Sequence, residues 1–176
     1  MRVVRSVRSA RVWSRSREKR EAFARETGAD AVNTAEQAVR GADIVVTATS
    51  AREPVLEAAW IVPGAHINAV GSNQARRREL PAELIERANR IVVDSIEQAR
   101  MESGDLLLAW GDRAWDDRVI ELKDVVAGQA AARTDPAAIT IFKSNGLAVE
   151  DVICAGFIYE KALESGSGRS MAALYS

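Results

Sequence analysis

Three apolar stretches of this chain each end in a short polar turn that could hold a charged or hydrogen-bonding ligand. Ser14-Arg15-Ser16 follows the stretch Arg11–Trp13, Thr47-Ala48-Thr49-Ser50 follows Ile44–Val46, and Gly71-Ser72-Asn73 follows Ile67–Val70. In a Rossmann fold the carboxyl ends of parallel strands point at a bound dinucleotide. The spacing therefore predicts a dinucleotide site built from successive strand ends.

The first of these turns bears on cofactor choice, because a Rossmann strand usually ends there in an Asp or Glu that binds the adenosine ribose. Here Ser14, Arg15 and Ser16 offer two hydroxyls and a guanidinium instead. A carboxylate would repel a 2′-phosphate, whereas Arg15 can pair with it bidentately. The turn thus predicts a preference for NADP(H) over NAD(H). The alternative is that Arg15 is a solvated residue and the serines cap a helix.

The two later turns are rich in small side chains, which let a ligand approach the backbone closely. We expect Thr47, Ala48, Thr49 and Ser50 to lie beside the cofactor, with an ordinary Ser/Thr turn as the alternative. Val70, Gly71 and Ser72 are expected near the nicotinamide. The turn Lys143–Gly146 precedes a long helical pattern, and a helix N-terminus offers N–H groups to an anion or amide.

Other residues that could do chemistry are expected to be structural. His66 is the only histidine, but it stands before the strand interior with no nucleophile or ligand spaced around it. Asp94 is expected to cap a helix or to support a site indirectly, and Lys143 to point outward. One His and one Cys cannot make a zinc site. Cys154 is expected to be a small buried apolar residue.

Composition narrows the class of protein. The chain has 176 residues, of which 47% are hydrophobic and 28% charged, as in a globular domain. A net charge of −1 and a pI near 6.0 give no electrostatic reason to expect nucleic acid or an anionic membrane as partner. The single cysteine, the lack of a signal peptide and the absence of an apolar run of about 20 residues predict a cytoplasmic protein without a membrane segment.

Strand and helix patterns alternate along the chain, which predicts an α/β fold with a mostly parallel sheet and helices on both faces. Strands are expected at 11–14, 31–32, 44–47, 67–70, 91–94 and 138–142. Helices are expected from Ser16 to a C-cap at Gly28, from a Thr34 capping box to Gly41, and over 80–90, 95–103, 121–126 and 147–165. Gly104 is expected to close its helix. In the last helix Ile153, Phe157 and Ile158 have core spacing.

Several of these segments, in this order, resemble the ornithine cyclodeaminase/mu-crystallin family over roughly residues 8 to 168. The segments that carry the resemblance are R-V-W-S-R-S, A-D-I-V-V-T-A-T-S, G-A-H-I-N-A-V-G-S-N, R-E-L, V-V-D-S, E-S-G-D and F-K-S-N-G-L-A-V-E-D. The family contains NAD(P)-dependent cyclodeaminases, alanine dehydrogenases and ketimine reductases. The resemblance implies a dinucleotide cofactor, a small amino-acid or imine substrate, and a possible homodimer.

The resemblance also assigns individual roles. It places the Thr47–Ser50 turn against the dinucleotide, and Ser144 and Gly146 beside the nicotinamide carboxamide. It makes Asn73 the candidate catalytic residue, at a position where cyclodeaminases proper carry an Asp that acts on the substrate amine. An Asn side chain can orient a water or an amine but cannot act as a general base. The departure argues against ornithine cyclodeamination and leaves imine reduction and amino-acid dehydrogenation open.

The resemblance covers only the C-terminal half of a family member, so residues 1–168 are expected to form an incomplete Rossmann-like domain and 169–176 a frayed tail. No G-x-G-x-x-G precedes Arg11, so the first strand and its glycine-rich loop are expected to be absent. That strand is central in the order 3-2-1-4-5-6. Residues 1–7 could replace it, its neighbours could pair directly, or a separate N-terminal chain could supply it. The expected protein is a truncated oxidoreductase with little activity alone, half of a split enzyme, or a non-catalytic dinucleotide-binding protein.

Overall fold

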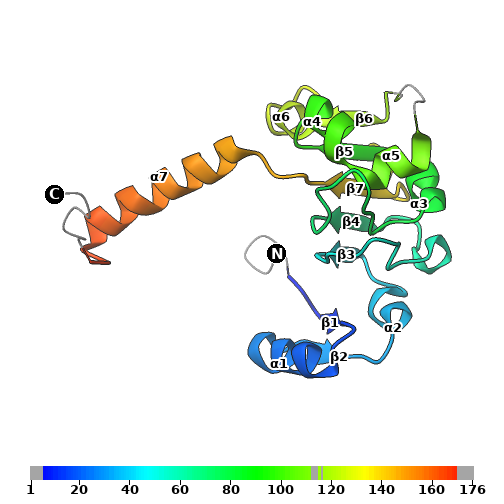
Figure 1. Cartoon of the computed structure of the whole chain (residues 1–176), viewed down its shortest axis with the longest axis horizontal. Helices are drawn as coiled ribbons and strands as arrows, with labels where there is room; N and C mark the ends of the chain where they lie inside the picture. The colour runs from blue at the N-terminus through cyan, green and yellow to red at the C-terminus, as the bar shows by residue number, and fades with distance from the viewer. Residues whose placement is uncertain (1–5, 112–114, 116, 170–176) are drawn as a thin grey trace. The chain divides into compact units, whose positions relative to one another are not determined.

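Strands and helices alternate along most of the structure, a computed structural model that describes residues 6–111, 115 and 117–169 (Figure 1). The chain divides after Asn145 into two compact units. Among the described residues, the first unit holds all of the strands and the second holds one long helix. The proposed strand from residues 1–7 and the proposed frayed tail fall almost wholly outside the described residues.

Five strands form one sheet, in the order β3-β4-β7-β5-β6, and all of the neighbouring pairs are parallel. They are β3 (Ile44–Thr47), β4 (His66–Ala69), β5 (Arg90–Val93), β6 (Val119–Glu121) and β7 (Thr140–Lys143). The central strands are rich in β-branched residues, as expected of a parallel sheet covered on both faces. Ile67, Ile91 and Ile141 are fully buried in them. The predicted α/β fold with a parallel sheet is confirmed, while β6 was not among the expected strands.

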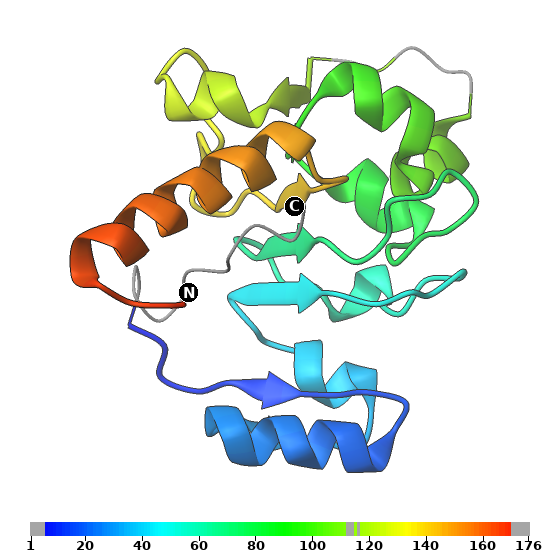
Figure 2. The same ribbon diagram turned by 60° about the vertical axis from the view of Figure 1, so that its left-hand side comes forward.

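Two further strands, β1 (Arg11–Val12) and β2 (Asp30–Ala31), form a separate parallel pair. Helix α1 (Arg17–Thr27) connects them, and its ends match the sequence prediction: Ser16 is the N-cap and Gly28, at φ 70°, is the C-cap. In Figure 2 the arrows of β1 and β3 point the same way. No hydrogen bonds join β1 to β3 among the described strands.

The remaining helices of the first unit are short. They are α2 (Ala35–Val39), the 3₁₀ helix η1 (Ala58–Trp60), α3 (Ala82–Arg87), α4 (Ile96–Glu102), α5 (Gly104–Trp110) and α6 (Leu122–Val126). The predicted Thr34 capping box is present, with Gln37 completing it. Helix α3 packs against α5. None of the described helices has both the length and the apolar composition that crossing a bilayer requires.

Gly104 corrects one prediction, because it begins α5 and does not close the helix before it. A Cβ atom at this position would lie 1.9 Å from the Arg77 carbonyl oxygen and 2.6 Å from that of Gln74. The glycine is therefore needed for close packing of two backbone segments, and its φ is not in the left-handed region that a helix-terminating glycine favours.

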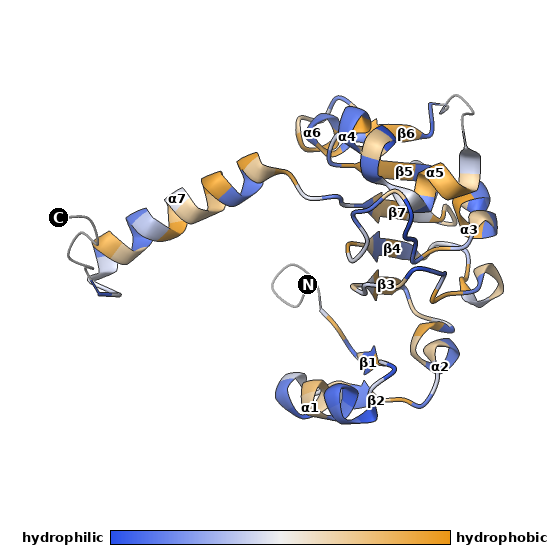
Figure 3. Cartoon of the chain, in the orientation of Figure 1, coloured by the Kyte–Doolittle hydropathy of each residue, from blue (hydrophilic) through white to orange (hydrophobic). Residues whose placement is uncertain are grey.

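The second unit consists of α7 (Ala148–Ser165), which ends as predicted at Gly166. Its apolar residues were expected in the core, yet Ile153, Phe157 and Ile158 are 66%, 61% and 65% exposed. Cys154, expected to be buried, is also exposed. Periodicity marks a helix face that is suited to burial but does not identify what covers it, and apolar and polar residues both occur along α7 (Figure 3).

Candidate functional site

The parallel register brings four strand ends to one edge of the five-stranded sheet. Thr47 of β3 is opposite Ala69 of β4, and Ala69 is opposite Lys143 of β7. Lys143 is also opposite Val93 of β5. The turns that follow these strands therefore emerge side by side. The structure brings together the Thr47–Ser50, Val70–Asn73 and Ser144–Asn145 segments that the sequence singled out.

A buried carboxylate, Glu79, connects the first two of these turns. It accepts hydrogen bonds from the Thr47 hydroxyl at 3.0 Å and from the Thr49 backbone N–H at 2.6 Å. It also accepts from the backbone N–H groups of Gly71 at 2.9 Å and Ser72 at 3.3 Å. Glu79 has no exposed surface. This single side chain therefore fixes the turn after β3 relative to the turn after β4.

Lys143 connects the same edge to the core, which corrects the expectation that it points outward. Its ammonium is fully buried and lies 3.4 Å from the Asp105 carboxylate, which is also fully buried. It donates to the carbonyl oxygens of Ala69, Ser72 and Ser144. An isolated charge in a protein interior is unfavourable because it loses its hydration. The Lys143 ammonium is stabilised there by hydrogen bonds to three carbonyl oxygens and by the Asp105 carboxylate.

Asp105 completes the buried network. One of its oxygens accepts the backbone N–H groups of Glu79 at 2.7 Å and Leu80 at 2.8 Å. Burial raises the pKa of Asp105 above its usual range, while the Lys143 ammonium and the two backbone hydrogen bonds oppose that rise. Glu79, Asp105 and Lys143, which we name the buried triad, thus link the backbone of all three turns.

Asp94, at the end of β5, holds the turn after β7. Its Oδ2 accepts from the Ser144 hydroxyl and from the Asn145 backbone N–H, both at 2.8 Å. Ser95, not Asp94, caps the following helix. The predicted supporting role of Asp94 therefore fits the geometry, and its predicted alternative as a cap does not.

The side-chain amide of Asn145 is a feature that the sequence prediction missed. Asn145 is only 9% exposed, and neither polar atom of its amide has a hydrogen-bond partner among the described residues. Buried polar groups without a partner are rare, and each needs an explanation such as a ligand or an ordered water. Asn145 thus presents one donor group and one acceptor at the same edge.

Gly71 and Ser72 are held by packing. A Cβ atom on Gly71 would lie 2.1 Å from the Thr49 nitrogen and 2.5 Å from a Glu79 oxygen, so no side chain fits there. Ser72 is buried, and its hydroxyl donates to the Arg77 carbonyl at 2.9 Å. Their contribution to a ligand site is accordingly through backbone shape. Ala48, Ser50, Val70 and Asn73 are exposed at this edge and can be contacted from solvent.

The turn after β1 presents a different set of groups. Ser16 caps α1 by accepting the Lys19 backbone N–H at 3.2 Å, as the structural alternative proposed. Ser14 is half-buried, and Arg15 is exposed. The Arg15 guanidinium has no hydrogen bond or ion pair within the described part of the chain and is free to meet a ligand. Gly146, the remaining predicted contact, belongs to the second unit and has φ 81°.

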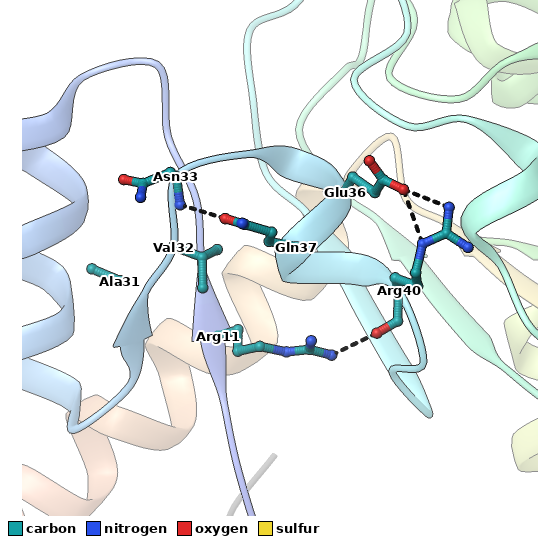
Figure 4. A pocket seen from close by; sticks show the side chains of 7 residues that line it. All are labelled: Arg11, Ala31, Val32, Asn33, Glu36, Gln37 and Arg40. Carbon is teal, nitrogen blue, oxygen red and sulfur yellow. Dashed lines mark hydrogen bonds and ion pairs between the residues drawn. The ribbon is translucent and has the colours of Figure 1, made fainter.

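Other candidates do not form a site. The His66 imidazole is hydrogen-bonded to the Thr140 hydroxyl at 2.7 Å, at the opposite end of β4. A cavity of about 560 Å³ lies between β1, the end of β2 with the residues after it, and α2 (Figure 4). Its polar groups are already paired: Arg11 with the Arg40 carbonyl, Glu36 with Arg40, and Gln37 with the Asn33 backbone. Within the described residues no cluster of His, Cys, Asp or Glu could hold a metal ion.

Comparison with known proteins agrees with this geometry. The model of the ornithine cyclodeaminase/mu-crystallin family matches residues 1–166. The ketimine reductase mu-crystallin of Rattus norvegicus is 42% identical over 157 residues, which are 88% of this chain and 48% of that protein. The chain thus spans about half the length of this curated relative.

Solved structures give the same result. A Δ(1)-pyrroline-2-carboxylate reductase from Thermococcus litoralis, in complex with NADH and L-proline, has a TM-score of 0.85 at 37% identity. The match covers 96% of this chain and 55% of that one. An archaeal alanine dehydrogenase dimer with bound NAD has a TM-score of 0.74 at 35% identity, covering 89% of this chain and 49% of that one.

Proposed function

Because the chain belongs to the ornithine cyclodeaminase/mu-crystallin family, we propose that it is the dinucleotide-binding part of an NAD(P)-dependent oxidoreductase that acts on a small imine or amino acid. The observation that carries the proposal is the alignment of Thr47, Ala69 and Lys143 at one sheet edge. Relatives with a similar fold are a pyrroline-2-carboxylate reductase and an alanine dehydrogenase. A nicotinamide dinucleotide, when bound, supplies or accepts the hydride.

The residues at the edge fit such a cofactor. The small exposed side chain of Ala48 leaves room for a close approach, while Gly71 lets the turns after β3 and β4 pack against each other. The unpaired amide of Asn145 offers a donor and an acceptor, which is the complement of a primary carboxamide. Ser144 is already held by Asp94, so its contribution would be positional.

Asn73 narrows the reaction class. It is exposed after β4 and carries an amide, which can orient a water or a substrate amine but cannot take a proton at neutral pH. We therefore favour imine reduction or amino-acid dehydrogenation over cyclodeamination.

Arg15 is the basis for proposing NADP(H) over NAD(H). Its guanidinium is exposed and unpaired at the end of β1, and the turn from Trp13 to Ser16 contains no carboxylate. A 2′-phosphate could pair with Arg15 and reach the Ser14 hydroxyl. The solved relatives named above hold NADH and NAD, so cofactor choice at Arg15 is a property to measure in this chain itself.

The test is a fluorescence titration of the purified protein with NADPH and with NADH. We expect NADPH to bind more tightly, and Arg15→Glu to weaken NADPH by about tenfold, since a charge-assisted hydrogen bond contributes about 1.5–3 kcal/mol. Arg25→Glu makes the same charge change in the last turn of α1 and should leave the affinity unchanged. Equal affinity for the two cofactors, or an equal effect of both variants, would contradict the preference.

We also propose that the described residues hold no counterpart of the first Rossmann strand and its glycine-rich loop. The support is that β1 and β3, the two strands that would flank that strand, belong to different sheets.

A further inference from the structure

Four arginines lie on two chain segments that run side by side next to the candidate site. The segment 49–55 continues from the turn after β3, and the segment 71–79 continues from the turn after β4. The Val55 backbone N–H donates to the Glu79 carbonyl at 2.8 Å, and the Thr49 backbone N–H donates to the Glu79 carboxylate at 2.6 Å. The arginines on these segments, which we name the arginine cluster, are Arg52, Arg76, Arg77 and Arg78.

The arginine cluster has more positive charge than its surroundings balance. The Arg78 guanidinium donates to the Glu53 carboxylate at 3.2 Å. Arg52 and Arg76 are exposed and Arg77 is half-buried, and the side chains of these three make no hydrogen bond or ion pair in the part of the chain that the structure describes. Like charges that are gathered in one place repel each other, and an anion that binds among them removes this repulsion. The cluster therefore points to an anionic ligand.

The turn that carries Arg76 also positions Asn73, the candidate for orienting a substrate. The Arg77 backbone N–H donates to the Gln74 carbonyl at 3.0 Å, which closes the turn. The Ser72 hydroxyl donates to the Arg77 carbonyl at 2.9 Å, which holds the turn to the end of β4. Arg76 and Asn73 are thus exposed three residues apart in one hydrogen-bonded segment.

We propose that the arginine cluster binds a carboxylate in the side chain of the substrate, so that the substrate is an imine or amino acid with two carboxylates. The inference rests on the proposed function, in which Asn73 orients the substrate. A guanidinium pairs bidentately with a single carboxylate, so three unpaired ones can bind more than the one carboxylate that every α-amino acid has. The cofactor 2′-phosphate is a weaker candidate, because Arg15, its proposed partner, follows β1 in the separate strand pair.

Two pairs of amino acids test the proposal, because the members of each pair differ in side-chain charge and have nearly the same shape. The pairs are L-aspartate with L-asparagine and L-glutamate with L-glutamine. Each compound is titrated into the purified protein, with and without NADPH, at constant ionic strength. Nuclear magnetic resonance of the arginine Nε–H groups follows the binding, and the substitutions below assign the signals.

We expect at least one of the two acids to shift the signals of the arginine cluster and to bind about tenfold more tightly than its amide. The reason is that the amide lacks the charge that strengthens a hydrogen bond to a guanidinium. Arg76→Gln and Arg52→Gln should each reduce the preference for the acid. Arg25→Gln removes the same charge from an exposed arginine in the last turn of α1 and should keep the preference.

Equal affinity for acid and amide in both pairs would overturn the proposal. An acid preference that persists in both Arg76→Gln and Arg52→Gln would also overturn it. Competition between the acid and NADPH would assign the cluster to the cofactor phosphates, and tighter binding of a single-stranded oligonucleotide through the same signals would assign it to nucleic acid.

The same titrations separate this proposal from the proposed function. NADPH binding without any preference for an acid would contradict the carboxylate site and leave the cofactor proposal standing. An acid preference in a protein that does not bind NADPH would contradict the cofactor proposal and leave the carboxylate site standing.

Discussion

Glu79 is the residue on which the geometry of the candidate site depends most. Its carboxylate accepts four hydrogen bonds, two from the turn after β3 and two from the turn after β4. All four donors approach acceptor oxygens, so a carboxamide in the same place would direct an NH₂ group at some of them. A buried site satisfied in this way allows little chemical substitution.

Glu79→Gln is therefore expected to lower the free energy of unfolding by about 2–3 kcal/mol, the range for hydrogen bonds to a charged group. Urea unfolding followed by circular dichroism measures it. Glu83→Gln, the same substitution at an exposed residue of α3, should stay within about 0.5 kcal/mol of the parent. If the two variants were equally stable, Glu79 would not be the anchor of these turns.

Asp105 gives the fold a pH dependence with a definite sign. Burial is the largest influence on this carboxyl and raises its pKa in the folded state. A group whose folded pKa is raised contributes stability at low pH, below the unfolded value of about 3.9, and that contribution is lost as pH rises through the folded pKa. Ionisation of Asp105 therefore works against folding, with the Lys143 ammonium limiting the loss.

We expect the free energy of unfolding to depend differently on pH in the parent and in the Asp105→Asn variant. The carboxamide keeps an oxygen that can accept from the Glu79 and Leu80 backbone N–H groups and has no charge to desolvate. Measured by urea unfolding from pH 4 upward, the parent should lose stability relative to the variant as pH rises through the raised pKa. If the stabilities of parent and variant changed in parallel with pH, the pKa of Asp105 would not be raised. If the parent gained stability relative to the variant as pH rises, the effect of the Lys143 ammonium on that pKa would exceed the effect of burial.

At the scale of elements, two glycines differ in whether the structure has space for a side chain. Gly71 sits where the turns after β3 and β4 meet, and an added Cβ would collide with the Thr49 backbone and with Glu79. Gly156 lies within α7 with open space around its missing side chain. The same substitution should therefore have opposite effects at the two positions.

Gly71→Ala is expected to destabilise the first unit by about 1–3 kcal/mol or more, the range for overpacking of a filled interior. Gly156→Ala should raise the helix content of α7, because Ala is favoured over Gly in a helix interior by about 1 kcal/mol. Circular dichroism with thermal unfolding distinguishes the two outcomes. Tolerance of Ala at position 71 would show that the two turns can separate.

The sequence predicted those elements whose signals are local. β-Branched runs marked β3 and β5, and the caps at Ser16, Gly28 and Thr34 bounded their helices correctly. Gly104 was misinterpreted, because a glycine needed for close approach to another segment looks the same as one that ends a helix.

The candidate site was predictable only where its residues follow local sequence signals. Strand ends can be located along a sequence, so the turns at Thr47–Ser50 and Val70–Asn73 were identified. Burial of Lys143 depends on Asp105, a carboxylate from a different element, and no local pattern pairs them. Glu79 and Asp105 lie in the R-E-L and E-S-G-D segments of the family resemblance, and that signal could have drawn attention to them.

At the scale of the whole molecule, apolar surface is left open in both units. The first has a groove between β1 and β3, and the second has the exposed face of α7 that includes Val152, Ile153 and Phe157. Large exposed apolar areas on a folded protein usually mark interaction surfaces. Both are therefore candidate interaction surfaces of a chain that spans about half the length of these relatives.

Catalytic activity is the property that should depend most on the half of the relatives that this chain does not match. Hydride transfer requires the substrate to be held against the nicotinamide in a near-attack geometry, and such positioning can be worth about 7–11 kcal/mol of barrier. The sheet edge offers groups for the cofactor, but among the described residues only Asn73 and the arginine cluster are candidates for holding a substrate. A helix N-terminus reached through a glycine-rich turn, the usual seat of the pyrophosphate, would have to come from outside the described residues.

We therefore expect this 176-residue chain alone to show no measurable reduction of a cyclic imine and no amino-acid dehydrogenation with NADPH or NADH. Adding a polypeptide that corresponds to the unmatched half of the relatives, in trans or by fusion, should restore turnover. Absorbance at the nicotinamide band follows the reaction, and an Asn73→Ala variant of the completed protein should lower kcat more than it changes cofactor affinity. Robust turnover by the chain alone would mean that its own residues complete both the phosphate site and the substrate site.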